Sequence, residues 1–256
     1  MYVVTSKEKL EVETLGSFAL LTSGNHEPVK RLVILLAITL AACGVPRDPE
    51  GTLARVSGGV MRVGVTDAPP WVEVGDTAPD GIEVRLVEQF AEEIEAEIEW
   101  VEGSEQELFG ALRFHELDLV LGGLTTETPW SAEASITHPY LTTATLVAVP
   151  ADSEASEDIS GLEVGVEANT EIAGLLRKTD ARVVEVDDIE DHEGPVAIEN
   201  YLTDDLEVVD TGVRLSESDH VFALPMGEND WMTKIEAFLL ERPDEIKRLL
   251  DELGTP

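Results

Sequence analysis

Apolar positions in the first half of the chain switch between continuous runs and helical spacing. A run at 61–65 predicts a buried strand. Apolar residues then recur at i, i+3, i+4 and i+7 over about 84–96, which predicts an amphipathic helix: Val87, Phe90, Ala91 and Ile94. Further runs at 98–103 and 117–123 predict strands, and Ser104 between them is a suitable N-cap for a second helix. This alternation is typical of a mostly parallel sheet covered by helices.

The second half of the chain shows the same alternation on both sides of a polar segment at 151–160. An apolar run at 144–150 precedes that segment, and 161–167 and 181–186 predict strands on either side of a short helix. A run at 220–225 predicts a strand that returns to the first unit. The last two predicted helices are marked by apolar residues at helical spacing and by a proline in a first turn: Trp231, Ile235, Phe238, Leu239 and Pro243.

The most apolar segment lies near the N-terminus and ends at the single cysteine. Residues 32–42 are eleven residues with one threonine, preceded by two basic side chains and closed by small residues. Roughly 20 apolar residues are needed to span a bilayer, so this segment is too short, but its order is that of a signal peptide. We therefore predict a signal peptide at 29–43. Residues 1–28 resemble no signal, and we interpret them as an N-terminal extension from a start assigned too early.

The end of this segment, Leu-Ala-Ala-Cys at 40–43, resembles the lipobox of bacterial lipoproteins. The resemblance implies cleavage before Cys43 and a diacylglycerol on its sulfur, which would anchor the protein to the cell membrane, in the periplasm or on the outer face. A buried core helix with an incidental thiol is the alternative. Residues 44–60 are rich in Gly, Pro and polar residues, which predicts a tether. The folded part then has no cysteine for a disulfide or a zinc site.

Strong negative charge narrows the range of partners. Without residues 1–43 the chain keeps 49 of its 53 acidic side chains and 13 of its 17 basic ones, so the net charge stays at -36. Such a surface repels phosphate backbones, which argues against nucleic-acid binding. It is also what a heavily solvated protein in concentrated salt would carry, and it says little about a small ligand.

From Met61 to about Leu253, six segments resemble, in the family's order, the solute-binding proteins of ABC importers that bind polar amino acids. They are MRVGVTDAPPW, GIEVRLVEQFAEEI, ALRFHELDLVLGGLT, HPYLTTATLVAV, GLEVGVEANTEIAGLL and HVFALPMGENDWMTKIEAFL. The resemblance implies an α/β, two-lobed, periplasmic-binding-protein-like (type II) fold with two hinge crossovers. It implies a first lobe formed by 61–147 and 221–256 and a truncated second lobe at 148–220.

The same resemblance carries ligand-binding positions onto this chain. Trp71 stands at the aromatic position after paired prolines, and Thr125 matches the pocket threonine. Asn169 and Thr170 stand where the second lobe offers a turn and a hydroxyl at a helix start. The family clamps the ligand's carboxylate with an arginine five residues after the pocket threonine, and here that position is Trp130.

An indole offers one neutral donor, so Trp130 cannot replace a guanidinium fork on a carboxylate. A pocket aromatic of the family falls here at Glu105, and Glu193 occupies the place of the aspartate that binds the ligand's amino group. Less positive charge and two added glutamates favour a cationic ligand, with Trp71 and Trp130 offering π faces. Hinge or core packing is the alternative for both tryptophans, and an exposed charge is the alternative for each glutamate.

Motifs of the common enzyme classes are missing: the sequence has no GxSxG, HExxH, P-loop or GxGxxG after a strand. Residues 187–193 carry several carboxylates and a histidine, but they lack the ligand spacing and turn glycine of a calcium loop. We therefore predict no enzyme activity, no metal site and no cofactor.

The sequence thus predicts a monomeric, lipid-anchored, extracytoplasmic solute-binding protein. It captures a small polar, cationic, amino-acid-like solute and delivers it to the permease of an ABC importer. The alternative is a degenerate relative of the same fold that acts as a sensor or accessory protein with no transported ligand. The missing arginine supports that alternative, and so does the second lobe, which is about 15 residues shorter than the family norm.

Overall fold

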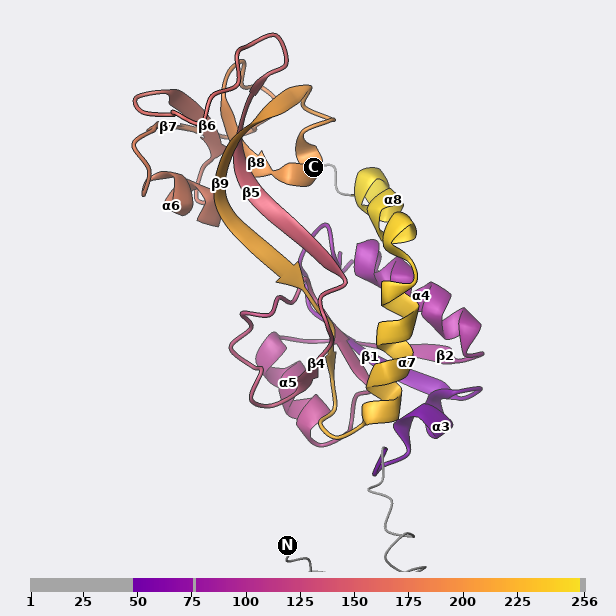
Figure 1. Ribbon diagram of the computed structural model, residues 1–256. Coiled ribbons are helices and arrows are strands. Elements are labelled where there is room, and N and C mark those ends of the chain that lie inside the picture. The colour runs from indigo at the N-terminus through magenta and orange to yellow at the C-terminus, as the bar shows by residue number, and fades with distance from the viewer. Residues whose placement is uncertain (1–47, 76, 254–256) are drawn as a thin grey trace, which may run out of the picture. The chain divides into compact units, whose positions relative to one another are not determined.

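The computed structural model describes residues 48–75 and 77–253 (Figure 1). The predicted extension 1–28, the predicted signal peptide with Cys43, and residues 44–47 of the predicted tether lie outside the described residues. None of the helices in the described part of the chain has the length and apolar character that crossing a membrane requires.

The first lobe is built on a sheet of five strands in the order β2-β1-β3-β10-β4. β1 lies parallel to β2 and β3, whereas β10 lies antiparallel to β3 and β4. Its strands are β1 (Val60–Val65), β2 (Glu97–Glu102), β3 (Leu119–Leu121), β4 (Ser135–Ile136) and β10 (Ala223–Leu224). Its described helices are α3 (Thr52–Val56), α4 (Ile82–Glu93), α5 (Glu105–Arg113), α7 (Asn229–Leu240) and α8 (Pro243–Leu253).

The core of the first lobe forms where α4 and α7 bury their apolar faces. The Phe90 ring of α4 lies 5.5 Å from the Trp231 ring and 5.0 Å from the Phe238 ring of α7, measured between centroids. The Trp231 indole donates to the Asp118 carbonyl at 2.8 Å, so this buried ring keeps a polar partner. The predicted helix at 84–96 ends earlier than its apolar spacing suggests, because Glu95 adopts a left-handed φ of 56°.

The predicted N-cap of the next helix is confirmed. Ser104 accepts from the Glu107 backbone N–H at 3.4 Å, and the Glu107 carboxylate accepts from the Ser104 N–H at 3.1 Å. This reciprocal capping box fixes the start of α5 and with it the position of Glu105, the first residue of the helix.

The second lobe is built on another sheet of five strands, in the order β7-β6-β8-β5-β9. β6 lies parallel to β7 and β8, and β5 lies antiparallel to β8 and β9. Its elements are β5 (Leu141–Pro150), β6 (Glu163–Glu167), α6 (Glu171–Leu176), β7 (Arg182–Val186), β8 (Val196–Glu199), the 3-10 helix η1 (Asn200–Leu202) and β9 (Val208–His220). Residues 187–195 join β7 to β8 without a helix or strand, which keeps this lobe small.

Two long strands, β5 and β9, connect the lobes (Figure 1). They pair from Leu141 with His220 at the first-lobe end to Pro150 with Val208 at the other end. The predicted returning strand at 220–225 is divided, because His220 completes β9 and only Ala223–Leu224 joins the first sheet. Two paired crossovers are the architecture that hinged, two-lobed binding proteins use.

The Asp48 carboxylate helps to fix the start of the described chain to the first lobe. Asp48 Oδ1 accepts from the backbone N–H groups of Asp230 and Trp231, at 2.9 and 3.1 Å, at the start of α7. Asp48 Oδ2 accepts from the Leu53 N–H at 3.0 Å, in the first turn of α3. One side chain therefore satisfies backbone donors at the N-termini of two helices.

Replacing this carboxylate should loosen both helix ends. We expect Asp48→Ala to lower the free energy of unfolding by about 1–2 kcal/mol, the usual cost of losing a helix cap. Urea unfolding followed by circular dichroism measures the change. The matched control is Glu50→Ala, because Glu50 is exposed and should change stability by less than about 0.5 kcal/mol. Equal effects of the two changes would contradict the capping role.

Candidate functional site

The first-lobe part of the site lies where β1 and β3 end. Trp71 follows β1 and is 8% exposed, and its indole packs on Gly123 in the loop after β3. Gly123 has a φ of +62°, and a Cβ there would lie 2.5 Å from Trp71 Cδ1, so the position requires glycine. The Trp71 and His220 rings lie 3.9 Å apart, and Thr125 forms a β-bridge with His220. The structure thus brings the predicted Trp71 and Thr125 together around His220.

The predicted Trp130 and Glu105 are hydrogen-bonded to each other. Trp130 Nε1 donates to Glu105 Oε2 at 2.8 Å, and the indole stacks on Phe109 of α5 with centroids 5.8 Å apart. One face of Trp130 is therefore covered. Glu105 therefore accepts the single polar donor of the Trp130 side chain, and a carboxylate rather than a cation lies beside the indole.

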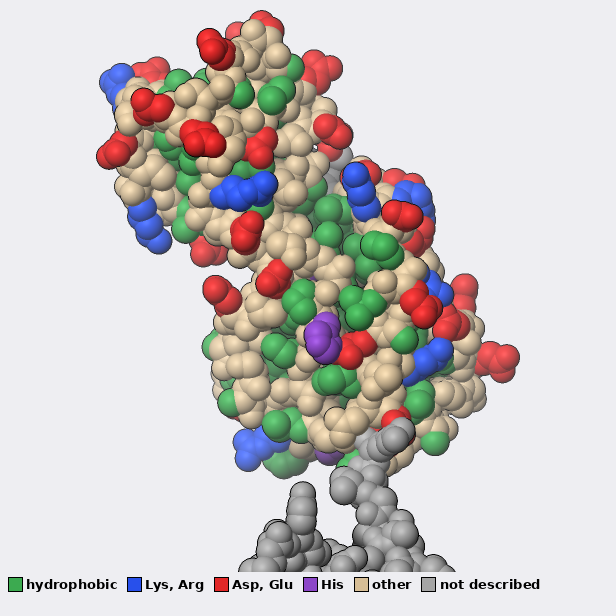
Figure 2. Space-filling view, in the orientation of Figure 1, with side chains coloured by type: hydrophobic (Ala, Val, Ile, Leu, Met, Phe, Trp, Pro, Cys, Tyr) green, Lys and Arg blue, Asp and Glu red, His purple; other side chains and the backbone are tan. Residues whose placement is uncertain are grey.

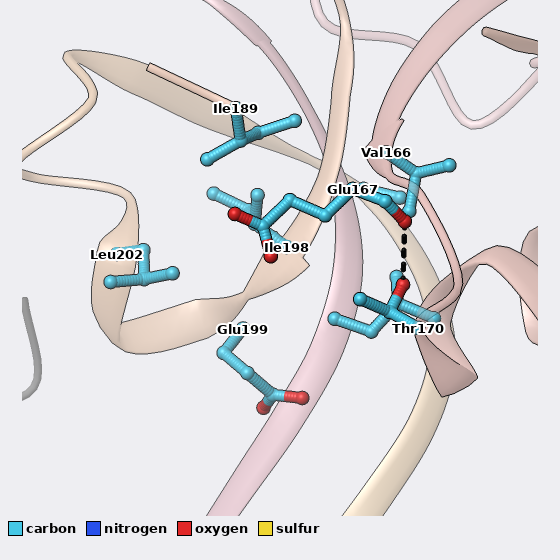
Figure 3. Close-up of a pocket in the computed structure, with 9 residues that line it drawn as sticks. Val166, Glu167, Thr170, Ile189, Ile198, Glu199 and Leu202 are labelled. Atoms are coloured by element: carbon cyan, nitrogen blue, oxygen red, sulfur yellow. Dashed lines mark hydrogen bonds between the residues drawn. The ribbon is translucent and has the colours of Figure 1, made fainter. Parts of the chain in front are cut away.

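The second-lobe part of the site is a cavity of about 190 Å³ beside β6, α6 and β8 (Figure 3). Thr170 lies at its edge as the N-cap of α6, accepting from the Ala173 N–H at 3.3 Å and donating to the Glu167 carbonyl at 2.8 Å. Figure 3 shows Glu167 and Glu199 among the side chains that line it. The remaining lining is apolar: Val166, Ile172, Ile189, Ala197, Ile198 and Leu202.

Glu199 is the more buried of the two cavity carboxylates. It accepts from the Thr145 hydroxyl on β5 at 2.7 Å. Burial raises the pKa of Glu199 above its ordinary value, and the nearby Glu171 raises it further, whereas the hydrogen bond lowers it. Within the described residues, neither Glu167 nor Glu199 pairs with Lys or Arg. The cavity therefore combines apolar walls with negative charge that lacks a protein cation.

Two predicted second-lobe residues lie outside this cavity. Asn169 is exposed, with a φ of 64°, in the turn before α6. Glu193 is exposed and lines a different concavity with His192 and Gly194 before β8, whereas Glu199 ends that strand. Thr170 is thus grouped with Glu199 and separated from Glu193. Among the described residues, no cluster of three or more His, Cys, Asp or Glu side chains is placed to hold a metal.

A buried network beneath the first-lobe loop was not predicted from the sequence. Glu83 is 0% exposed and accepts from the Gly122 N–H at 2.8 Å, the Gly123 N–H at 3.1 Å and the Tyr140 hydroxyl at 2.6 Å. Burial raises the pKa of Glu83, and these three hydrogen bonds lower it in part. The sequence did indicate that Glu83 is buried, because this residue lies four positions before Val87, on the apolar face of the same helix.

His220 was also missed. It is 4% exposed, and its Nε2 lies 3.0 Å from the Thr143 hydroxyl, at the hinge end of β9. Burial lowers the pKa of His220 to about 4, which keeps the ring neutral at physiological pH. The sequence offers no signal for this role, because the histidine stands at the edge of an ordinary apolar run.

Two five-stranded sheets joined by paired crossovers define a two-lobed protein of the type II periplasmic-binding fold. The model of the family described as "Bacterial extracellular solute-binding proteins, family 3" matches residues 61–252, and the chain belongs to this family. The predicted family and fold are confirmed. Membership places the chain among extracellular solute-binding proteins.

Solved structures show the same fold at low sequence identity. The L-cystine solute receptor of Neisseria gonorrhoeae, unliganded and open, has a TM-score of 0.63 and 16% identity over 79% of this chain and 96% of its own. An ancestral cationic amino acid solute binding protein has a TM-score of 0.62 and 18% identity over 80% of this chain and 99% of its own. A candidate ABC-transporter binding component from Wolinella succinogenes, complexed with lysine, has a TM-score of 0.52 and 14% identity. The match covers 77% of this chain and 97% of the Wolinella chain.

A curated relative matches a smaller part of the chain. Membrane-bound lytic murein transglycosylase F of Vibrio cholerae is 30% identical over 101 residues, which are 38% of this chain and 19% of the transglycosylase. The same enzyme of Vibrio parahaemolyticus is 31% identical over 100 residues, again 38% and 19%. This chain therefore matches about a fifth of the length of these relatives.

Proposed function

We propose that the protein is a lipid-anchored extracytoplasmic solute-binding protein that captures a small cationic, amino-acid-like solute for an ABC importer. The observation that carries this proposal is the second-lobe cavity, with Glu167 and Glu199 unpaired among apolar walls. A carboxylate and a cation about 4 Å apart attract each other by about 4 kcal/mol at an effective dielectric constant of 20. A ligand ammonium or guanidinium supplies the positive charge that the cavity lacks.

The first-lobe wall supports the same ligand class. The Trp130 position has a neutral donor that Glu105 already accepts, so the wall offers no cation to a ligand carboxylate. Trp71 and Thr125 remain as the contacts for the rest of the solute, through an indole edge and a hydroxyl. A ligand with a strong positive charge and a weakly held carboxylate fits this pattern better than an acidic amino acid.

The mechanism follows from the two crossovers. The solute binds Trp71 and Thr125 first, and the second lobe then adds Thr170, Glu167 and Glu199. Because the solute interacts with more groups in the closed form, it shifts the population toward closure. The permease of the importer distinguishes the closed, loaded form from the open one. Asn169 and Glu193 are assigned no contact in this mechanism.

Thermal unfolding with a ligand panel tests the proposal. Residues 44–256, which include every described residue, are heated with lysine, arginine, diamines, quaternary ammonium compounds, glutamate and neutral amino acids at low and high salt. A ligand that binds only the folded state stabilises it by about 2.7 kcal/mol at 100 times its dissociation constant, so the midpoint must rise. We expect cations to raise it most. A larger rise with glutamate would contradict the charge argument while keeping solute binding.

A degenerate domain of the same fold, acting as a sensor or accessory protein with no transported ligand, is the second candidate. The short connection at 187–195 and the partial match to a cell-wall enzyme favour it. A well-folded sample whose midpoint moves with no member of the panel would select this candidate and reject the first.

A further inference from the structure

One end of the first lobe gathers exposed apolar side chains. Val60, Phe114 and Met226 are 44%, 71% and 54% exposed, and they are three of the five large hydrophobic side chains that are exposed among the described residues. The other two lie elsewhere, Val209 in the second lobe and Leu240 at the end of α7.

Strand directions place the three side chains at the same end of the first sheet. Val60 begins β1, and Phe114 ends α5 just before β3, which runs parallel to β1. Met226 follows β10, which runs antiparallel to β3 and so finishes at the end where β3 begins. Arg62 Nη2 donates to the His115 carbonyl at 2.9 Å, which holds the end of α5 against β1.

The first described residues, from Asp48 onward, lie at this same end. Glu228, two residues after Met226, accepts from the backbone N–H groups of Glu50 and Thr52, both at 3.0 Å. Five residue steps separate Cys43 from Asp48, and a chain of that length reaches at most about 18 Å. A lipid on Cys43 would therefore hold this end of the first lobe close to the bilayer.

We propose that this end, formed by Val60, Phe114 and Met226, is a membrane-contact surface that inserts into the interfacial region of a phospholipid bilayer when Cys43 is anchored. The inference rests on the proposed lipid anchor. Burying one such side chain is worth about 1.5–3 kcal/mol, too little to hold a free protein on a membrane. The anchor makes the contact intramolecular, so small binding energies suffice to orient the lobe.

Charge favours an uncharged phospholipid surface over a strongly anionic one. The Arg113 guanidinium lies 5.8 Å from the Phe114 ring, has no carboxylate partner within the described residues, and is placed to meet a lipid phosphate. Elsewhere the chain is acidic. Figure 2 shows acidic side chains over the second lobe and along the flank of α4 and α8, and an acidic side chain also at the lower edge of the first lobe. Contact through this end keeps the acidic side chains of the second lobe away from the membrane. The exposed Glu97, which pairs with Val60, and the exposed Glu116 lie at this end, and they oppose contact with an anionic surface.

This orientation leaves the ligand site free. Trp71 and Thr125 follow the carboxyl ends of β1 and β3, opposite to the ends that carry the apolar surface. In this orientation, the proposed solute-binding residues of the first lobe face away from the bilayer and stay accessible to a ligand.

Quenching of tryptophan by brominated lipid tests the surface. The chain from Cys43 onward, which includes every described residue, is coupled through that thiol to a maleimide phospholipid in phosphatidylcholine vesicles with brominated acyl chains. In the Phe114→Trp variant, the fluorescence contributed by the added tryptophan should fall by about half. Interfacial side chains insert roughly 5–10 Å, which brings the indole close to the brominated acyl chains. Leu240→Trp, an exposed position at the other end of α7, is the matched control and should lose none.

Absence of quenching in Phe114→Trp, or equal quenching in both variants, would overturn the membrane-contact surface. Adding Met226→Glu to Phe114→Trp should reduce the quenching, since a charge opposes insertion. Chemical coupling makes the result independent of natural lipidation, which mass spectrometry of Cys43 in the native protein tests separately. Failure of the contact surface and failure of the proposed anchor are therefore distinguishable.

Discussion

Glu199→Gln should weaken binding of the cationic solute by about ten- to a hundredfold, because each factor of ten corresponds to 1.4 kcal/mol and a buried charge partner is worth several times that. The substitution keeps the shape of the side chain and its capacity to accept from Thr145, so it removes charge and little else. The raised pKa of Glu199, caused first by burial, indicates a carboxylate that gains from a cationic partner. Titration calorimetry with the best ligand of the panel measures the change.

The matched control for this change is Glu193→Gln. Both variants lose one negative charge from the same lobe, but Glu193 is exposed and lies before β8 rather than in the cavity. We expect its effect to be less than about twofold at physiological salt, where charges more than about 8 Å from the ligand are screened. Equal losses in the two variants would show that the affinity reflects net charge and would remove Glu199 from the site.

The second large effect concerns stability. Glu83→Ala should lower the free energy of unfolding by about 3 kcal/mol or more, since it leaves one buried N–H group, one partly buried N–H group and one buried hydroxyl without their acceptor, at about 1–3 kcal/mol each. The affected groups belong to Gly122, Gly123 and Tyr140. Urea unfolding measures the loss. The exposed Glu92 on the same helix provides the control, because Glu92→Ala should change stability by less than about 0.5 kcal/mol.

A double-mutant cycle separates the network from simple burial. Tyr140→Phe removes one donor and should cost less than Glu83→Ala, about 1–2 kcal/mol. In the Glu83→Ala background the same change should cost little, because its partner has already been lost. Additive losses would show that the hydroxyl and the carboxylate act independently, contrary to the network that positions the loop leading to Thr125.

The elements of the first lobe could be predicted because their signals are local. Ser104 and Glu107 form the expected cap within one turn, and apolar spacing identified α4. The end of α4 could not be predicted, because Ile94 continues the apolar spacing while the backbone turns left-handed at Glu95. The returning strand was longer in prediction than in the structure, since a run of apolar residues cannot show that His220 pairs with Leu141.

For the candidate site, the resemblance supplied positions, but it could not supply the contacts between residues distant in sequence. Trp71 and Thr125 both contact His220, and Trp130 donates to Glu105, whereas their roles as ligand contacts stay predictions. Glu199 gains its place from Thr145 on a crossover strand, which sequence spacing does not reveal.

The same limit explains the missed buried acid of the first lobe. Glu83 gains its role from groups 39, 40 and 57 residues away along the chain. The sequence-based assignment of Asn169 and Glu193 as ligand contacts stays a prediction that the proposed mechanism does not adopt.

One measurement tests the central claim, cation-selective solute binding, most directly. Residues 44–256 are titrated by calorimetry with the ligand that raises the melting midpoint most and with an isostere whose ammonium or guanidinium is replaced by a methyl group, such as 2-aminoheptanoic acid in place of lysine. The account predicts that the neutral isostere binds at least about tenfold more weakly, a difference of 1.4 kcal/mol or more. Equal or tighter binding of the neutral isostere would contradict it.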